Sequence, residues 1–185
     1  MNHAVLPPWN EQGVLPPVDV EDNRSPYQVS LWRFVARFNT SAERQSILKG
    51  LLNYRKELHA AGLVQGFQWV DGSFVENVER LEGRPPRDLD VVTFFDLPSG
   101  WDQRALRGKF PNLFDRDRVK SSHSVDAYYQ LRKGSDLDRL IEQTTYWYGH
   151  LSHRRDDRWK GFIQVDLSPE EDESEDIIQF LMKSA

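Results

Sequence analysis

The stretch that decides the fold is FQWVDGSFVENVERLEGRPPRDLDVVTFF, residues 67–95. Its first apolar run predicts a short strand that leads into the turn Gly72-Ser73. A break rich in glycine and proline, 83–86, separates this turn from a second apolar run, 89–95, which predicts another strand. Asp90 interrupts the second run near its start. The sequence therefore predicts two core strands, the second of which begins with carboxylates.

Asp88 and Asp90 would point to the same face of the second strand, because side chains alternate with a period of two. Two carboxylates so close together repel each other unless a cation neutralises them. Magnesium takes oxygen ligands, commonly one or two carboxylates together with substrate phosphates. The pair therefore predicts a cation site, although Asp-x-Asp also occurs in calcium loops and on surface strands.

The turn Gly72-Ser73 supplies a part that complements the carboxylates. Glycine lets the backbone approach an anion closely, and the N-terminus of a helix starting here would favour phosphate. The Ser73 hydroxyl can add a hydrogen-bond donor. We expect a triphosphate to lie between this turn and a metal ion, although Gly-Ser by itself is a common turn.

Asp126 lies within the otherwise apolar run VDAYYQL, which predicts a third strand over 124–131. A buried carboxylate without a partner is costly, so Asp126 needs a cation or an arginine beside it. If its strand neighbours the Asp88–Asp90 strand, Asp126 completes a site for two cations of the kind used in phosphoryl displacement. It could also accept the proton of an attacking hydroxyl.

The remaining patterns predict an α/β (α+β) fold with a small mixed sheet flanked by helices. Thr40 to Glu43 resembles a capping box at the start of a long amphipathic helix. A second long helix is expected over 135–151, with an apolar stripe made by Leu137, Leu140, Ile141, Thr144 and Trp147. Residues 110–122, rich in Asp, Arg and Lys, suggest a solvated connection. A further strand is expected over 159–167.

Three segments are expected along the chain: a Pro-rich extended arm, 1–25, a central domain, 26–168, and an acidic C-terminal tail with a short helix, 169–185. The 185 residues carry 29 acidic and 24 basic side chains and no cysteine. Disulfides and thiolate metal sites are thereby excluded, and a reducing, cytoplasmic setting is favoured. No apolar segment is long enough to span a membrane, so no membrane partner is expected.

At Gly72, Ser73, Asp88, Asp90 and Asp126 the chain resembles the nucleotidyltransferase superfamily with the polymerase-beta-like fold. The runs GFQWVDGSFVE, PPRDLDVVTFF and HRRDDRWKGFIQVDL, with PPWNEQGVLPP near the start, resemble more closely a group of small, poorly characterised bacterial proteins of that superfamily. The closer resemblance spans most of the chain, whereas the superfamily motif covers about 67–130. The spacer between Ser73 and Asp88 is longer than in many compact members.

The resemblance implies Mg²⁺-dependent transfer of a nucleoside monophosphate from a nucleoside triphosphate (NTP), with ATP favoured and Mn²⁺ as a substitute metal. The acceptor would be a hydroxyl on a protein or an RNA. Asp88 and Asp90 would bind the metals, Asp126 would be the catalytic-metal ligand, and Gly72 and Ser73 would hold the triphosphate. Small members of the superfamily often belong to toxin–antitoxin or phage-defence systems.

The basic segment HRRDDRWKG, 153–161, allows two interpretations. Arg155 and Lys160 could bind the phosphates of a nucleotide or a nucleic-acid backbone, or the segment could be a solvated turn balanced by Asp156 and Asp157. For the whole chain, an alternative to the enzyme is a non-catalytic module that keeps the fold and acts through a partner protein, for example as an antitoxin.

Overall fold

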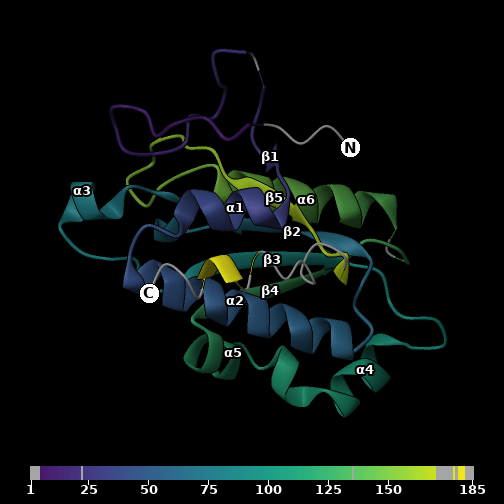
Figure 1. Cartoon of the computed structure of the whole chain (residues 1–185). Coiled ribbons are helices and arrows are strands. Elements are labelled where there is room, and N and C mark those ends of the chain that lie inside the picture. Colours follow the sequence, from purple (N-terminus) through teal and green to yellow (C-terminus); the bar gives the residue numbers. More distant parts are fainter. Residues whose placement is uncertain (1–4, 22, 135, 170–176, 178, 182–185) are drawn as a thin grey trace.

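The computed structural model describes residues 5–21, 23–134, 136–169, 177 and 179–181, and a five-stranded mixed sheet forms its centre (Figure 1). The strand order is β1-β5-β2-β3-β4. β2 is antiparallel to both β3 and β5, whereas β3 is parallel to β4 and β1 is parallel to β5. The strands are β1 (Tyr27–Gln28), β2 (Gly66–Asp71), β3 (Leu89–Phe95), β4 (Val125–Leu131) and β5 (Ile163–Asp166). The predicted mixed α/β architecture is confirmed.

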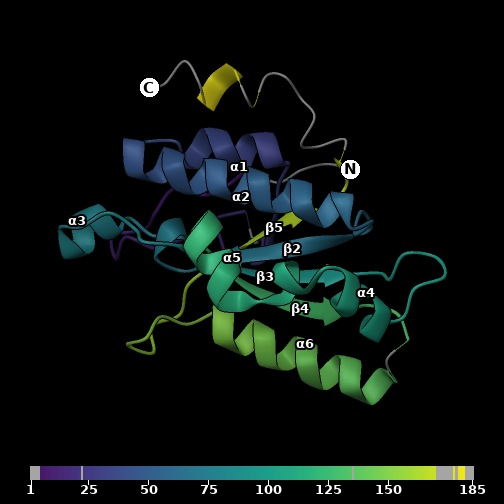
Figure 2. The ribbon, with the colours of Figure 1, turned by 90° about the horizontal axis from the view of Figure 1, so that it is seen from below.

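Two helices, α1 (Leu31–Phe38) and α2 (Ala42–Ala60), cover one face of this sheet (Figure 2). They bury a continuous core against Val70 of β2, Val91 of β3 and Ala127 of β4. The predicted capping box at Thr40 is displaced by one residue: the Ser41 side chain accepts the hydrogen bond from the Arg44 backbone N–H. The shift follows from the extended backbone of Ser41, which makes it the residue preceding the first helical turn.

The opposite face is covered by α6 (Leu137–Leu151) (Figure 2). A smaller core there consists of Trp69, Val92, Phe94, Leu151 and Phe162, with Phe67, Tyr128 and Trp147 packed against it. The predicted apolar stripe is wrong at the start of this helix, where Leu137 is 70% and Ile141 is 55% exposed. The helix therefore covers the sheet mainly through its C-terminal half, because the aromatic side chains of the sheet lie under that half.

Residues 103–123 fold into a helical connection between β3 and β4. It consists of α4 (Gln103–Lys109), a 3-10 helix η2 (Pro111–Phe114) and α5 (Arg116–His123). The connection predicted over 110–122 is largely exposed, as expected, but it is helical, which the prediction missed. Asp115 caps α5 by accepting from the Arg118 N–H, and Val119 and Leu113 are buried. One buried residue on an eight-residue helix leaves no recognisable apolar period, so the pattern concealed α5.

The N-terminal arm packs along the domain and joins its loops. The indole of Trp9 donates to the Val75 carbonyl (2.7 Å), and the Gly161 N–H donates to the Leu15 carbonyl (2.7 Å). The Tyr27 hydroxyl donates to the Pro16 carbonyl (2.8 Å). These contacts attach the arm to the segment after β2, to the segment before β5 and to β1.

The predicted acidic run, 170–176, lies outside the described residues. Beyond it, Ile177 and Leu181 are buried, and the ring of Phe180 meets that of Trp32 of α1 edge to face, with centroids 5.1 Å apart. None of the helices in the described part of the chain combines the length and the apolar character that a membrane crossing needs.

Candidate functional site

Three carboxylates lie side by side at one end of the sheet, on β2, β3 and β4. Asp71 pairs with Asp90 in the antiparallel register, and Asp90 pairs with Asp126 in the parallel register. Trp69, Val92 and Tyr128, each two residues from one of these carboxylates on the same strand, belong to the core under α6, so the carboxylates share that face. We call Asp71, Asp90 and Asp126 the acidic row. Asp88, two residues before Asp90, extends it.

The turn Gly72-Ser73 follows β2 directly and lies against Asp90. Gly72 has φ +87°, and a Cβ at this position would lie 2.7 Å from the Asp90 Oδ2. Only glycine permits both the backbone conformation and the close approach. Ser73 begins η1 (Ser73–Val75), a single 3-10 turn that is followed by α3 (Val78–Glu82). A helix was expected to begin here, but this single turn is too short to provide a helix dipole. The turn can favour an anion only through close approach of its backbone.

Helix α5 places two cations over the outer carboxylates. The Lys120 Nζ lies 2.7 Å from the Asp88 Oδ2 and 3.0 Å from the Asp126 Oδ2. The Arg116 guanidinium binds both oxygens of Asp126, with Nη2 2.8 Å from Oδ2, and stacks over the Tyr128 ring at 4.4 Å. Arg116 and Lys120 are four residues apart, so both project from one face of α5. We call these four charged residues the α5 ion-pair cluster.

The pKa values of Asp126 and of its neighbour Asp90 are shifted in opposite directions. Hydrogen bonds from Arg116, and then from Lys120, hold the pKa of Asp126 below its usual value. Burial, and then the charges of Asp88 and Asp126, raise the pKa of Asp90. Among the described residues, no hydrogen bond or ion pair reaches the Asp90 carboxylate. The centre of the site thus holds a carboxylate that is repelled by its neighbours and has no cation of its own.

A second charged cluster lies beneath the Gly72-Ser73 turn. The Lys160 Nζ is 2.9 Å from the Asp71 Oδ1 and 2.9 Å from the Glu76 Oε1, and the lysine is 3% exposed. Arg154 reaches the other oxygen of Glu76 at 3.1 Å. Burial raises the pKa of Asp71 to about 7, and the two carboxylates raise the pKa of Lys160 although burial opposes them. We call Asp71, Glu76, Arg154 and Lys160 the buried ion-pair cluster.

The structure brings together Gly72, Ser73, Asp88, Asp90 and Asp126 from the set that the sequence predicts. Lys160 lies below the turn, with its ammonium group between two carboxylates, and Arg155 is exposed on the turn 153–159. Sequence analysis missed Asp71, Glu76, Arg116 and Lys120. The position of Asp71 next to Gly72, and the spacing of Arg116 and Lys120, are the signals that could have revealed them.

Asp88, Asp90 and Asp126 provide the oxygen donors that magnesium prefers, and the gap left by Gly72 opens onto Asp90. Within the described residues, however, no three side chains of the metal-binding types are arranged as a ready-made metal site. The ion pairs explain this arrangement, because Asp88 and Asp126 are turned toward Lys120 and Arg116. As donors the residues fit magnesium, provided that the cations of α5 move.

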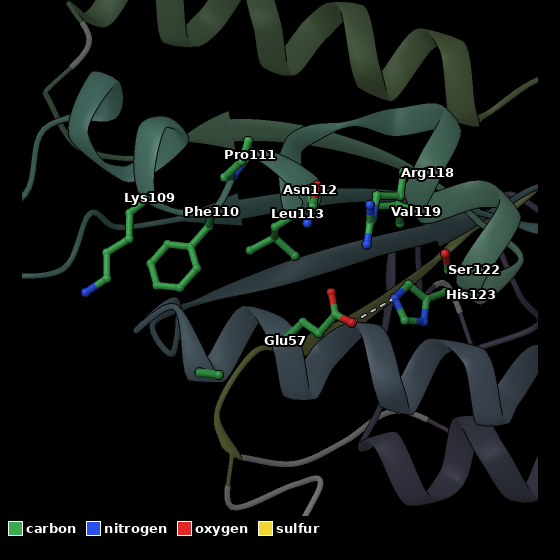
Figure 3. A pocket seen from close by; sticks show the side chains of 11 residues that line it. Glu57, Lys109, Phe110, Pro111, Asn112, Leu113, Arg118, Val119, Ser122 and His123 are labelled. Atoms are coloured by element: carbon green, nitrogen blue, oxygen red, sulfur yellow. Dashed lines mark ion pairs between the residues drawn. The ribbon is translucent and has the colours of Figure 1, made fainter.

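A separate cavity of about 370 Å³ lies between α2 and the α4–η2–α5 connection (Figure 3). Glu57 and His123 face each other there, with Oε1 and Nε2 3.2 Å apart, and Arg118 points into the cavity (Figure 3). None of the predicted site residues lines it. It therefore does not belong to the acidic row.

The fold and site define an α/β protein with a carboxylate row at one end of its sheet. A family model described as a family of unknown function (DUF6932) matches residues 7–166, so the chain belongs to this family. No curated protein and no solved structure matches the chain.

Proposed function

We propose that the protein is a magnesium-dependent nucleotidyltransferase that moves a nucleoside monophosphate from an NTP to a hydroxyl group on a protein or RNA. One observation carries the proposal. The strand register puts the Gly72-Ser73 turn, the Asp88–Asp90 pair and Asp126 at the same end of the sheet. The order of α2, β2, the Gly72-Ser73 turn, β3, β4 and α6 along the chain also supports the polymerase-beta-like fold of the superfamily that the sequence resembles.

Each residue has a role that its position allows. Gly72 would admit the triphosphate beside Asp90, because its backbone leaves room where a Cβ would clash. The Ser73 hydroxyl would donate to a phosphate oxygen. Asp88, Asp90 and Asp126 would hold Mg²⁺, which when bound neutralises the triphosphate and makes the acceptor hydroxyl more acidic. Lys160 would act from below, by fixing both ends of the turn through Asp71 and Glu76.

A second candidate is a non-catalytic module that acts through a partner protein. The α5 ion-pair cluster favours it, because Asp88 and Asp126 already have cationic partners within the chain. In that case Arg116 and Lys120 would be permanent structural partners of the carboxylates. The two candidates differ in whether magnesium and nucleotide bind at all.

The test is label transfer from each of the four α-³²P NTPs in the presence of Mg²⁺, with total RNA and cell lysate as acceptors. We expect the wild type to label one class of acceptor and to release pyrophosphate. The double variant Asp88→Asn, Asp90→Asn should lose more than about a hundredfold of this rate, because it lacks the metal ligands.

Asp138→Asn is the matched control, since Asp138 is an exposed carboxylate in the first turn of α6. It should label like the wild type. Equal labelling by the double variant and the wild type, or no labelling with any NTP and acceptor, would refute the nucleotidyltransferase.

A further inference from the structure

The two cations of α5 lie where the charge of a metal ion would be needed. Lys120 bridges Asp88 and Asp126, the outer carboxylates of the proposed metal site, and Arg116 binds Asp126 through both oxygens. Asp126 is almost fully buried, with its side chain 7% exposed, so its charge needs compensation at all times. A metal ion and these two side chains therefore compete for the same oxygens.

The same two side chains are only partly buried. The side chains of Arg116 and Lys120 are 51% and 45% exposed, and each lies at the end of a long flexible stem on a short helix. Each cation is about half exposed, so leaving Asp126 costs it little burial, provided that a metal ion takes over the compensation of the buried carboxylate. The buried ion-pair cluster contrasts with this, because Lys160 is 3% exposed and cannot leave without exposing two buried carboxylates.

We propose that Arg116 and Lys120 are exchangeable occupants of the metal site and phosphate ligands of the nucleotide-bound state. In the free protein they balance the charge of Asp88 and Asp126. When a metal ion binds the carboxylates, both side chains are repelled from it and turn to the triphosphate, which carries the negative charge that they have lost. This inference rests on the proposed function and deepens it by naming the residues that bind phosphate.

The proposal makes binding of metal and nucleotide mutually dependent. A metal ion alone must displace two cations, whereas a metal ion with a triphosphate offers both of them a new partner. By linkage, each ligand then increases the affinity for the other. Removal of a cation should therefore change the two affinities in opposite directions.

The test first measures the affinity of the protein for Mn²⁺ in the absence of nucleotide, from the electron paramagnetic resonance signal of the free ion. It then measures the affinity for a non-hydrolysable ATP analogue at saturating Mg²⁺, by calorimetry. For Lys120→Gln and Arg116→Gln we expect Mn²⁺ to bind about tenfold more tightly than to the wild type, since one competing charge is gone. The nucleotide should bind about tenfold more weakly. Lys120→Arg, which keeps the charge, should restore both affinities in large part.

Arg118→Gln is the control on the same helix, because Arg118 lines the cavity toward α2 and not the acidic row. It loses the same charge and should change both affinities by less than about threefold. Circular dichroism of every variant checks that the fold is kept. Loss of both affinities together in Lys120→Gln, or no change in either, would overturn the proposal.

The failures of the two proposals can be told apart. If Asp88→Asn, Asp90→Asn binds Mn²⁺ as the wild type does, the proposed metal site and function fail. If that double variant loses Mn²⁺ and Lys120→Gln matches the wild type, only the exchange of cations fails. No Mn²⁺ binding by any of these proteins overturns both.

Discussion

Two ion-pair clusters flank the Gly72-Ser73 turn, and they use the same chemistry in different surroundings. In the α5 ion-pair cluster, Lys120 bridges Asp88 and Asp126 with its side chain 45% exposed. In the buried ion-pair cluster, Lys160 bridges Asp71 and Glu76, and its side chain is only 3% exposed. The comparison separates burial from pairing: under our proposal, the buried lysine is a structural element and the half-exposed lysine is an exchangeable ligand.

The largest effect is expected from the buried ion-pair cluster. Lys160→Met keeps the length of the side chain but leaves two buried carboxylates without their cation. We expect it to lower the free energy of unfolding by about 3–5 kcal/mol. Denaturant unfolding measures this change, and Arg155→Met, at an exposed position of the same segment, should stay within about 0.5 kcal/mol. Equal effects at the two positions would contradict the structural role of Lys160.

The protonation of the two clusters should also differ. Burial raises the pKa of Asp71 to about 7, whereas hydrogen bonds from Arg116 and Lys120 hold the pKa of Asp126 below its usual value. Asp71 should therefore oppose folding increasingly as the pH rises from about 4 to 7. Asp126 should stabilise the fold above its unfolded pKa, and this contribution should disappear as the pH falls below it. Carbon-13 NMR titration of labelled aspartate carboxyls tests both signs, and Asp71 titrating below Asp126 would contradict them.

Gly72, between the clusters, should tolerate substitution poorly. Gly72→Ala places a Cβ 2.7 Å from the Asp90 Oδ2 and forces alanine to adopt φ +87°. We expect a loss of about 1–3 kcal/mol in the free energy of unfolding. Gly83→Ala is the matched control, because Gly83 also has a positive φ (+65°) but no atom within 4 Å of the added Cβ. Thermal unfolding of both should show the smaller loss at Gly83, and the reverse order would show that Gly72 does not touch Asp90.

The smallest effect on stability is expected in the α5 ion-pair cluster. Lys120→Met removes a half-exposed cation, and we expect the free energy of unfolding to change by less than about 1 kcal/mol. The change should shrink further at high salt, since exposed charges are screened. Urea unfolding at two salt concentrations measures it. A loss as large as that of Lys160→Met would remove the distinction between the clusters.

The sequence predicted the acidic site better than the elements around it. Asp88, Asp90 and Asp126 could be found because carboxylates stand out in apolar strands, and the strand register does bring them together. Helix α5 could not be found, because its only buried residue is Val119 and its other side chains are polar or charged. The ion pairs of Arg116 and Lys120 with Asp88 and Asp126 are tertiary contacts, which no local pattern encodes. Strand β1 was not predicted for a similar reason, because a strand of two residues shows no alternation of polar and apolar side chains.

The burial of Lys160 is a second feature that the sequence did not predict. The sequence grouped it with Arg155 as a phosphate ligand, because both belong to one basic run. The structure separates the two: Lys160 is held in the interior by Asp71 and Glu76, and Arg155 is exposed. Burial of one lysine in a charged segment depends on carboxylates more than eighty residues away, and composition alone does not reveal it.

The measurement that tests the central claim most directly is calorimetric titration of Mg²⁺ with each non-hydrolysable NTP analogue into the wild type and into Asp88→Asn, Asp90→Asn. We predict that the wild type binds at least one nucleotide in the presence of Mg²⁺ and not in its absence, and that the double variant binds none. Binding that is unaffected by the double substitution, or no binding by the wild type to any of the four, would contradict the claim that Asp88, Asp90 and Asp126 form a metal-dependent nucleotide site.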